Sequence, residues 1–206
     1  GFNIADQYRN PVLILADGML GQMMEPVQLP TGEGVYSLEA MLKTKPWALS
    51  GHEGKRERNA IKSVYLKQDL LEQHVETLWK KYEQAEKELV DWEETNLEKA
   101  QVVFVAFGTT SRMVKEAMAE LNNMGLETGL IRPKTLWPFP YKAFENLWEG
   151  TKQVISCELS KGQLVQDVAL GVAGRKPVHL IQRTGGMLLT PEEIIEKTIQ
   201  IIEGGE

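Results

Sequence analysis

Cysteine is nearly absent from this sequence of 206 residues. The one cysteine, Cys157, lies in the apolar run QVISCEL, and we interpret it as a buried structural thiol. A single thiol excludes a disulfide within the chain, and it excludes an iron–sulfur cluster held by this chain alone, which takes about four thiolates. The three histidines, His52, His74 and His179, share no metal-ligand spacing. We therefore predict no metal site.

Long hydrophobic runs and a secretory signal are also missing. No apolar run approaches the roughly 18 residues that a membrane span needs, and no basic segment precedes an apolar core at the N-terminus. The net charge of −6, without a basic patch, disfavours binding to a phosphate backbone. We expect a cytoplasmic chain that binds neither membranes nor nucleic acid.

Charged residues are distributed unevenly along the chain. Residues 1–98 carry 11 Lys+Arg against 17 Asp+Glu, whereas residues 99–206 carry 12 of each. Together with the composition, this break predicts three regions, 1–57, 58–98 and 99–206.

Region 1–57 contains one predicted buried strand, Val12 to Ala16, which breaks at Asp17-Gly18. About thirty residues of Gly- and Pro-rich sequence follow without obvious regular structure, which is too much for a domain interior. Either this segment wraps over a surface, or its packing partner is absent from the chain.

Region 58–98 is charged and is predicted to be a helical linker. Its apolar residues alternate in steps of four and three, which places them on one stripe of a long helix. They are Leu71, Val75, Leu78, Tyr82, Ala85, Leu89 and Trp92. We favour a connecting helix that packs on its own chain or on a partner subunit. A short two-stranded coiled coil is the alternative.

Region 99–206 alternates predicted strands and helices. The strands are placed at 101–107, 128–133, 153–159 and 177–183, and the helices at 111–122, 141–148, 162–172 and 191–202. Continuous apolar strands separated by helices are typical of a mostly parallel sheet covered on both faces. The predicted fold class is therefore α/β, with three layers in the order α/β/α. Local signals agree: Ser111 can cap the first helix, and Thr190 followed by Pro191 can begin the last one.

Two loops after predicted strands offer groups that can bind an anion, because ligands of such sheets usually meet the carboxyl ends of the strands. In the first, Gly108, Thr109, Thr110, Ser111 and Arg112 combine a tight turn, three hydroxyls and a cation at a helix start. A capped turn at a subunit contact is the alternative. Neither a GxGxxG fingerprint nor a Walker A loop is present.

The second such loop contains Arg183, Thr184, Gly185 and Gly186, where paired glycines beside an arginine suit close approach to an anion. A flexible turn is the alternative. No nucleophile elbow and no nucleophile–histidine arrangement can be read from the spacing.

The other two loops carry aromatic and acidic residues. Trp137, Pro138, Phe139 and Pro140 form a rigid apolar knob, which either faces a partner or folds onto the domain's own core. Glu158 is either an acid or base, or an acceptor for the free amides of the next helix.

The N-terminal stretch lacks the signature of thiamine-diphosphate binding. That signature is Gly-Asp-Gly followed within about thirty residues by Asn-Asn, but Ala16 precedes Asp17-Gly18, and the next asparagine is Asn59. We predict that this chain does not hold the diphosphate.

Five ordered motifs nevertheless resemble one family. PVLILADGMLGQMMEPV, GTTSRMVKEAM, GLIRPKTLWPFP, ELSKGQLVQDV and RTGGMLLTPEEI are similar, in that order, to the α subunit of 2-oxoacid:ferredoxin oxidoreductases. The branch acting on 2-oxoisovalerate or 2-oxoglutarate is the most similar. The resemblance implies that 1–57 is the tail of a thiamine pyrimidine-binding domain and that this chain is part of a longer protein. It also implies that 99–206 is a transketolase C-terminal-like domain with a five-stranded sheet, one strand of which is antiparallel and still unassigned.

The implied activity is oxidative decarboxylation of a 2-oxoacid with coenzyme A, giving an acyl-CoA and reduced ferredoxin. Thiamine diphosphate, Mg²⁺, iron–sulfur clusters and coenzyme A belong to the complex, and none is expected on this chain alone. The implied partners are a thiamine-diphosphate-binding β subunit, a ferredoxin-like subunit and ferredoxin.

On this basis the chain serves subunit assembly rather than catalysis, and no residue is assigned a catalytic role. The loops 108–112 and 183–186 are binding or interface candidates, and Glu25 in GQMMEP is a weaker one. Two other functions are weighed against this one: a free-standing α/β ligand-binding module, and a structural domain of a branched-chain 2-oxoacid dehydrogenase.

Overall fold

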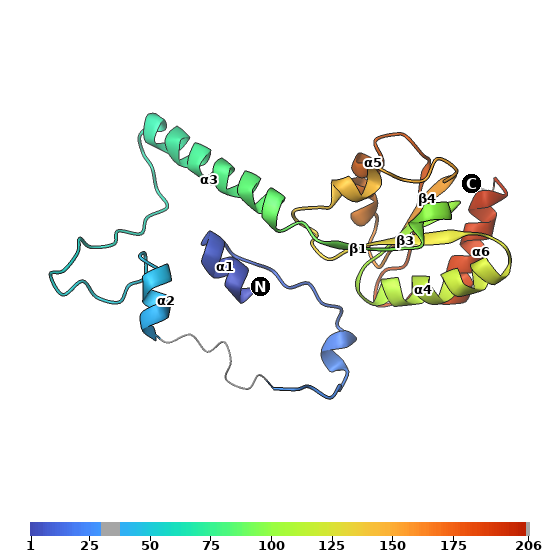
Figure 1. Ribbon diagram of the computed structural model, residues 1–206, viewed down its shortest axis with the longest axis horizontal. Helices are drawn as coiled ribbons and strands as arrows, with labels where there is room; N and C mark the ends of the chain where they lie inside the picture. The colour runs from blue at the N-terminus through green and yellow to red at the C-terminus, as the bar shows by residue number, and fades with distance from the viewer. Residues whose placement is uncertain (30–37, 205–206) are drawn as a thin grey trace. The chain divides into compact units, whose positions relative to one another are not determined.

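The computed structural model describes residues 1–29 and 38–204 and divides into two compact units, Gly1–Tyr82 and Glu83–Glu206 (Figure 1). Most of the predicted Gly-rich loop at 29–37 lies outside the described residues. Within the described ranges, no helix combines the length and the apolar character needed to cross a membrane.

The first unit consists of short helices and extended segments held by polar contacts. It contains α1 (Phe2–Tyr8), the 3₁₀ turn η1 (Leu20–Gln22), α2 (Leu38–Thr44) and most of α3 (Gln68–Glu88). Lys45 forms an ion pair with Asp6, and Lys81 donates to Asn10 at 2.9 Å. The guanidinium of Arg9 lies 4.8 Å from the centre of the Trp47 ring. Sequence analysis missed α1 and α2.

The predicted buried strand at Val12–Ala16 is wrong for this structure. Residues 11–17 have no regular structure, and Leu13, Ile14 and Leu15 each expose at least 67% of their surface. A strand needs a neighbour to pair its backbone groups, and no described residue of the first unit forms one. The apolar run alone therefore did not produce a strand.

The second unit is a five-stranded sheet in the order β1-β3-β2-β4-β5. The strands are β1 (Trp92–Thr95), β2 (Val102–Val105), β3 (Thr128–Pro133), β4 (Gln153–Glu158) and β5 (Val178–Gln182). Only β1 runs antiparallel to its neighbour; the other pairs are parallel. The unassigned fifth strand is thus β1, an antiparallel edge strand inside the predicted linker.

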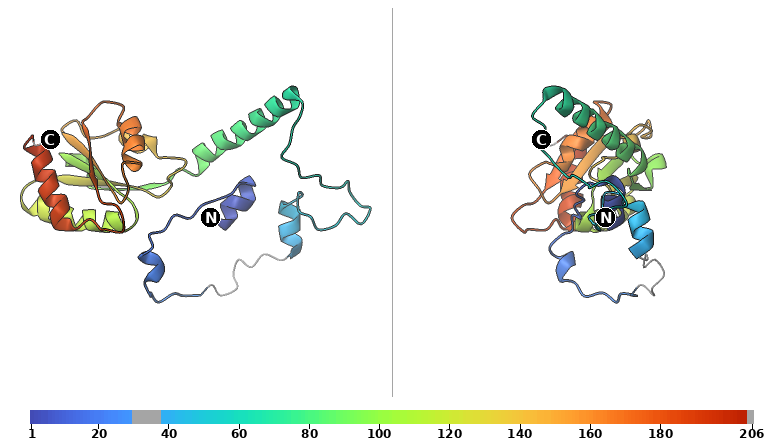
Figure 2. Two further views of the ribbon diagram at one scale, coloured as in Figure 1. Left: turned by 180° about the vertical axis from the view of Figure 1, so that it is seen from behind. Right: turned by 90° about the vertical axis from the view of Figure 1, so that its left-hand side faces the viewer.

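Helices cover both faces of this sheet, so the predicted α/β/α layering is confirmed (Figures 1 and 2). Val102 and Phe104 of β2 face α4 (Gly108–Asn123) and α6 (Pro191–Ile202), whereas Val103 and Val105 face α5 (Leu164–Val172) and η3 (Tyr141–Phe144). Side chains of a strand alternate between its faces, which explains why all four residues are buried.

Helix boundaries followed local signals where these were strong. α6 begins and ends where it was predicted, and the Thr190 hydroxyl accepts from the Glu193 amide at 3.2 Å. The predicted helix at 141–148 is only a 3₁₀ turn, Tyr141–Phe144. The long linker helix ends at Glu88, so Trp92 belongs to β1 rather than to the helical stripe.

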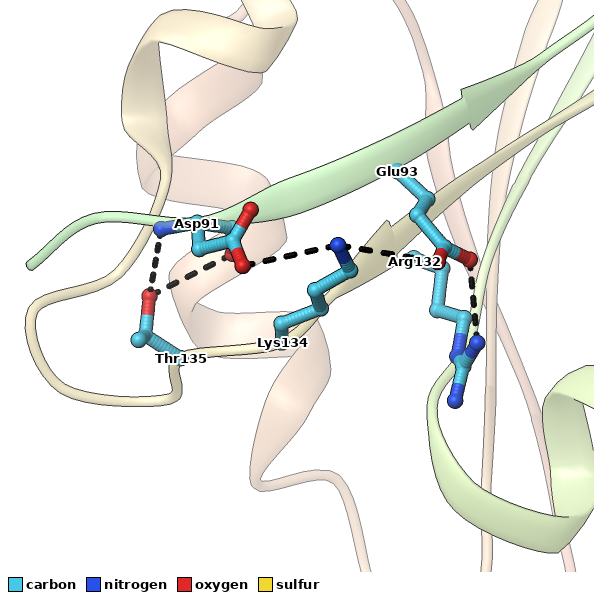
Figure 3. Close-up of polar contacts among 5 residues, drawn as sticks. All are labelled: Asp91, Glu93, Arg132, Lys134 and Thr135. Atoms are coloured by element: carbon cyan, nitrogen blue, oxygen red, sulfur yellow. Dashed lines mark hydrogen bonds and ion pairs between the residues drawn. The ribbon is translucent and has the colours of Figure 1, made fainter. Parts of the chain in front are cut away.

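Alternating charges join β1 to β3 at the sheet edge (Figure 3). Arg132 donates to Glu93 at 2.9 Å, and Lys134 lies 3.4 Å from Asp91 and 3.6 Å from Glu93. The Thr135 hydroxyl accepts from the Asp91 amide at 3.0 Å. Charged side chains on an edge strand discourage pairing with another chain, so β1 closes this side of the sheet.

The pKa of the Glu93 carboxylate should be lower than that of an ordinary glutamate. The hydrogen bond from Arg132 lowers the pKa of Glu93. Because the pKa is depressed on folding, the contact stabilises the fold above the ordinary carboxyl pKa, and this contribution is lost as the pH falls through the folded pKa. Carboxyl ¹³C NMR titration should show the Glu93 midpoint rising in Arg132→Met and unchanged in the remote Arg175→Met. Equal midpoints in all three proteins would contradict the assignment.

Candidate functional site at the carboxyl edge of the sheet

The parallel strands β2, β3, β4 and β5 all end at one edge of the sheet, and each is followed by a loop singled out in the sequence. From β2 the chain crosses to β3 on one side, while β4 lies on the other side. Loops that leave neighbouring strands in opposite directions create the switch point where α/β sheets usually bind ligands. Here the switch point lies between the start of α4 and the start of α5.

The loop after β2 leads directly into α4. Gly108 has φ of 58°, a left-handed conformation that suits glycine. Thr109, Thr110 and Ser111 are buried, and only Arg112 is exposed. The expected Ser111 cap is wrong: the helix begins three residues earlier with Phe107 at its N-cap, and the Ser111 hydroxyl donates to the Gly108 carbonyl at 2.7 Å.

The loop after β4 is organised by the Glu158 carboxylate. It is 3% exposed and accepts from the backbone amides of Gln163, Leu164 and Val165 at 2.8–3.0 Å. The Ser160 hydroxyl also donates to this carboxylate. These donors occupy the carboxylate, and its charge complements the positive end of α5. Of the two roles weighed for Glu158, the structure shows the amide acceptor.

The loop after β5 combines one ion pair with two left-handed glycines. Arg183 Nε donates to Glu193 Oε2 at 2.9 Å, and Lys197 lies 2.7 Å from the other carboxylate oxygen. Burial opposes ionisation of Glu193, but the hydrogen bonds from Lys197 and Arg183 outweigh it and lower its pKa. Gly185 and Gly186 have φ of 68° and 86° in an exposed turn. Arg183 is therefore anchored to α6.

The apolar knob after β3 folds mostly inward. Pro138, Phe139 and Pro140 are buried, with Phe139 only 6% exposed, whereas Trp137 is 56% exposed. The interpretation that the knob folds onto the core is therefore confirmed for three residues, whereas Trp137 is exposed and its contact with a partner stays a prediction.

The aromatic cluster behind the knob continues to α5. The Phe139 and Phe144 rings stack with centres 5.9 Å apart. The Tyr141 hydroxyl donates to Asp167 Oδ1 of α5 at 2.9 Å. Burial, and then this hydrogen bond, raise the pKa of Tyr141. The sequence showed no sign of the Tyr141–Asp167 contact, since the two residues lie far apart along the chain.

The structure brings 108–112 and 183–186 to the same edge, but Glu25 lies exposed in the first unit. Their binding or interface roles stay predictions. Among the described residues, no group of three His, Cys, Asp or Glu is placed to hold a metal ion. Cys157 lies inside the sheet, and burial raises the pKa of its thiol. Among the described residues, the loops at this edge expose the Trp137 ring and the cations Arg112, Lys161 and Arg183.

Comparison with known proteins identifies relatives of the chain. Residues 100–194 match the family model described as pyruvate:ferredoxin oxidoreductase core domain II. The ketoisovalerate oxidoreductase subunit VorB of Methanothermobacter marburgensis is 38% identical over 203 residues, which cover 97% of this chain and 55% of that protein. The 2-oxoglutarate synthase subunit KorA of Methanocaldococcus jannaschii is 28% identical, over 94% of this chain and 57% of that protein. The chain spans about half the length of these curated relatives.

A solved structure supports the same relationship. It is a 2-oxoglutarate:ferredoxin oxidoreductase from Magnetococcus marinus with 2-oxoglutarate, coenzyme A and succinyl-CoA bound. The two structures superpose with a TM-score of 0.56 at 26% identity, over 68% of this chain and 24% of the other.

Proposed function

This chain belongs to the 2-oxoacid:ferredoxin oxidoreductase family, and from that premise we propose that it is part of the α subunit of such an enzyme. The observation that carries the proposal is the 38% identity to a ketoisovalerate oxidoreductase subunit over 97% of the chain. The enzyme would oxidatively decarboxylate a 2-oxoacid, giving an acyl-CoA and carbon dioxide and passing electrons to ferredoxin. A branched-chain substrate such as 2-oxoisovalerate is favoured, because the KorA relative is less similar.

The role proposed for this chain is assembly. Thiamine diphosphate, when bound by the complex, supplies the electron sink for decarboxylation, but the described residues do not fit it. The sequence lacks the Gly-Asp-Gly…Asn-Asn signature at which the diphosphate and its Mg²⁺ bind. Cys157, buried and alone, does not fit an iron–sulfur cluster. The phosphates of coenzyme A do not fit at the start of α5, because the Glu158 carboxylate already occupies the amides there and would repel them. These groups are therefore assigned to partner chains: a thiamine-binding β subunit and a ferredoxin-like subunit.

The domains follow the same proposal. Residues 99–206, completed by β1, form the transketolase C-terminal-like domain. Residues 1–57 form the tail of a pyrimidine-binding domain, and 58–98 form the linker. The exposed run Leu13–Leu15 supports this, because it fits a strand whose neighbours lie outside the described residues. Loops 108–112 and 183–186 border the subunit contact at the carboxyl edge.

Partner capture tests the proposal. The tagged chain, incubated with oxygen-free extract of its source organism, should retain a subunit with the Gly-Asp-Gly…Asn-Asn motif and a cysteine-rich ferredoxin-like chain, identified by mass spectrometry. The reconstituted complex should reduce ferredoxin in the presence of 2-oxoisovalerate and coenzyme A. Capture of a thiamine subunit without a cluster protein would favour a dehydrogenase instead.

A substitution at Trp137 tests whether the partner subunit contacts this chain at the carboxyl edge. Trp137→Ala should reduce capture of the thiamine subunit several-fold, because exposed aromatic side chains commonly anchor protein interfaces. Met124→Ala is the matched control: Met124 is also exposed, but it follows the end of α4, away from the helix start at the carboxyl edge. Equal losses in both variants would count against a contact at this edge.

A further inference from the structure

The two edges of the five-stranded sheet differ in charge. At one edge, Glu93, Arg132 and Lys134 form ion pairs beside β1. At the other edge, β5 contains no Asp, Glu, Lys or Arg in its sequence VHLIQ. Proteins commonly place charged side chains on an edge strand to keep other strands from pairing with it. The β5 edge lacks this protection.

The outward backbone groups of β5 have no partner in the described part of the chain. The Arg183 amide, just after the strand, donates to the Glu158 carbonyl of β4 at 3.2 Å. Because hydrogen-bonding direction alternates along a strand, the odd-numbered residues of β5 bond to β4. The N–H and C=O groups of Val178, Leu180 and Gln182 therefore point outward, and no described residue bonds to them. Such a row of free groups is a template for a further strand.

Uncharged side chains border this edge on the α5 face of the sheet. An added Cβ at Gly162 would lie 3.3 Å from Leu180 Cδ2 and 3.4 Å from Val165 Cγ1. Val165 therefore marks the side of α5 that lies near β5. Ala169, one helical turn further along α5, is on the same side and is exposed. Neither Val165 nor Ala169 carries a charge that would oppose the approach of a second helix.

We propose that β5 pairs with β5 of a second copy of this chain, antiparallel and centred on Leu180. In that register Leu180 bonds to Leu180 of the other copy, and Val178 bonds to Gln182. Each contact occurs twice by two-fold symmetry, as an isologous interface requires. The outward residues are evenly placed about the centre of the strand, so a second copy gives every outward N–H an outward C=O.

The side chains that become neighbours in this register are compatible. Opposite residues of an antiparallel pair point to the same face of the sheet. On the α5 face Leu180 therefore meets Leu180 of the other copy, and Val178 meets Gln182. On the α6 face His179 meets Ile181. No ionised carboxylate, ammonium or guanidinium group is trapped within the strand pair.

The cations at the two ends of β5 also stay apart. Lys176, before the strand, falls opposite Thr184 of the other copy, and Arg183, after the strand, falls opposite Pro177. Lys176 and Arg183 point to opposite faces because one has an even and the other an odd number. The register therefore brings no like charges together, and this is why we assign the edge to a second copy.

The association should be reversible. One pair of strands of five residues, with one helix contact, covers less than the roughly 1,200–2,000 Å² of a standard interface. Sedimentation velocity of the purified chain over a range of concentrations should therefore show a monomer–dimer equilibrium. A chain that stays monomeric throughout would overturn the proposal.

Amide hydrogen exchange, measured by NMR, locates the contact. Exchange of the Val178, Leu180 and Gln182 amides should slow in proportion to the fraction of dimer as the concentration rises. The His179 and Ile181 amides should be protected at every concentration, because they already bond to β4. A dimer in which the outward amides exchange at the rate of the monomer would overturn the register.

Proline substitution tests the edge directly. Val178→Pro removes one outward N–H from each copy but no hydrogen bond within the chain, and edge strands tolerate proline. It should raise the dimer dissociation constant about tenfold or more, because the dimer loses two hydrogen bonds. Val178→Ala, the matched control, shortens the side chain but keeps the amide, and should change the constant less than about threefold. Equal effects of the two variants would overturn the proposal.

The exchange pattern of the parent decides the question even if Val178→Pro does not fold. The dimer is separate from the proposed subunit role, because partner capture and self-association are measured separately.

Discussion

Replacing Glu158 with alanine is expected to lower the free energy of unfolding by about 3–5 kcal/mol. The carboxylate is buried and accepts from three backbone amides at the start of α5. Removing it leaves those donors without their acceptor and leaves a cavity at the end of β4. Urea unfolding followed by circular dichroism measures the loss.

Two variants separate this capping role from charge and volume. Glu158→Gln keeps the volume but replaces one acceptor oxygen with a donor, so it should also destabilise, though less than alanine. Glu192→Ala removes an exposed carboxylate from the first turn of α6 and should have a far smaller effect. A loss below about 1 kcal/mol in Glu158→Ala would show that water replaces the carboxylate, since a net hydrogen bond contributes about that much.

Elements with strong local signals were predicted well. The bounds of α6 could be predicted from Thr190, Pro191 and the spacing of its apolar residues, all of which lie in or next to the helix. Strands β2 to β5 read as apolar runs because both faces of the sheet are covered. The amide-acceptor role of Glu158 was one of two interpretations, and only the distances to the next helix decided between them.

Elements that depend on distant partners were not predicted. β1 contains Trp92, Glu93 and Glu94, which continue the charged pattern of the helix before it; its strand character comes from pairing with β3 across 39 residues. The run at 12–16 shows the reverse case, with strand-like sequence and no described neighbour. The burial of the knob after β3 could not be predicted either. No local pattern tells which of its aromatic rings packs into the core.

The aromatic cluster behind that knob gives the second large effect. Phe144→Ala should lower the free energy of unfolding by about 3–5 kcal/mol, the usual cost of removing a buried phenylalanine. Phe144 is fully buried, stacks on Phe139 and packs against α5. Trp137→Ala, in the same segment but exposed, should cost about 1 kcal/mol or less. Urea unfolding of the two variants makes the comparison.

Gly171 of α5 shows whether the Phe144 ring sets the helix position. A Cβ at Gly171 would lie 2.7 Å from Phe144 Cδ2, so Gly171→Ala should destabilise the parent by about 1–3 kcal/mol. In the Phe144→Ala background the added methyl enters the cavity, and alanine favours the helix by up to about 1 kcal/mol over glycine. The same substitution should then be neutral or stabilising, a coupling of at least about 1 kcal/mol. Additive losses would mean that α5 shifts freely over this face and that Phe144 does not fix the glycine.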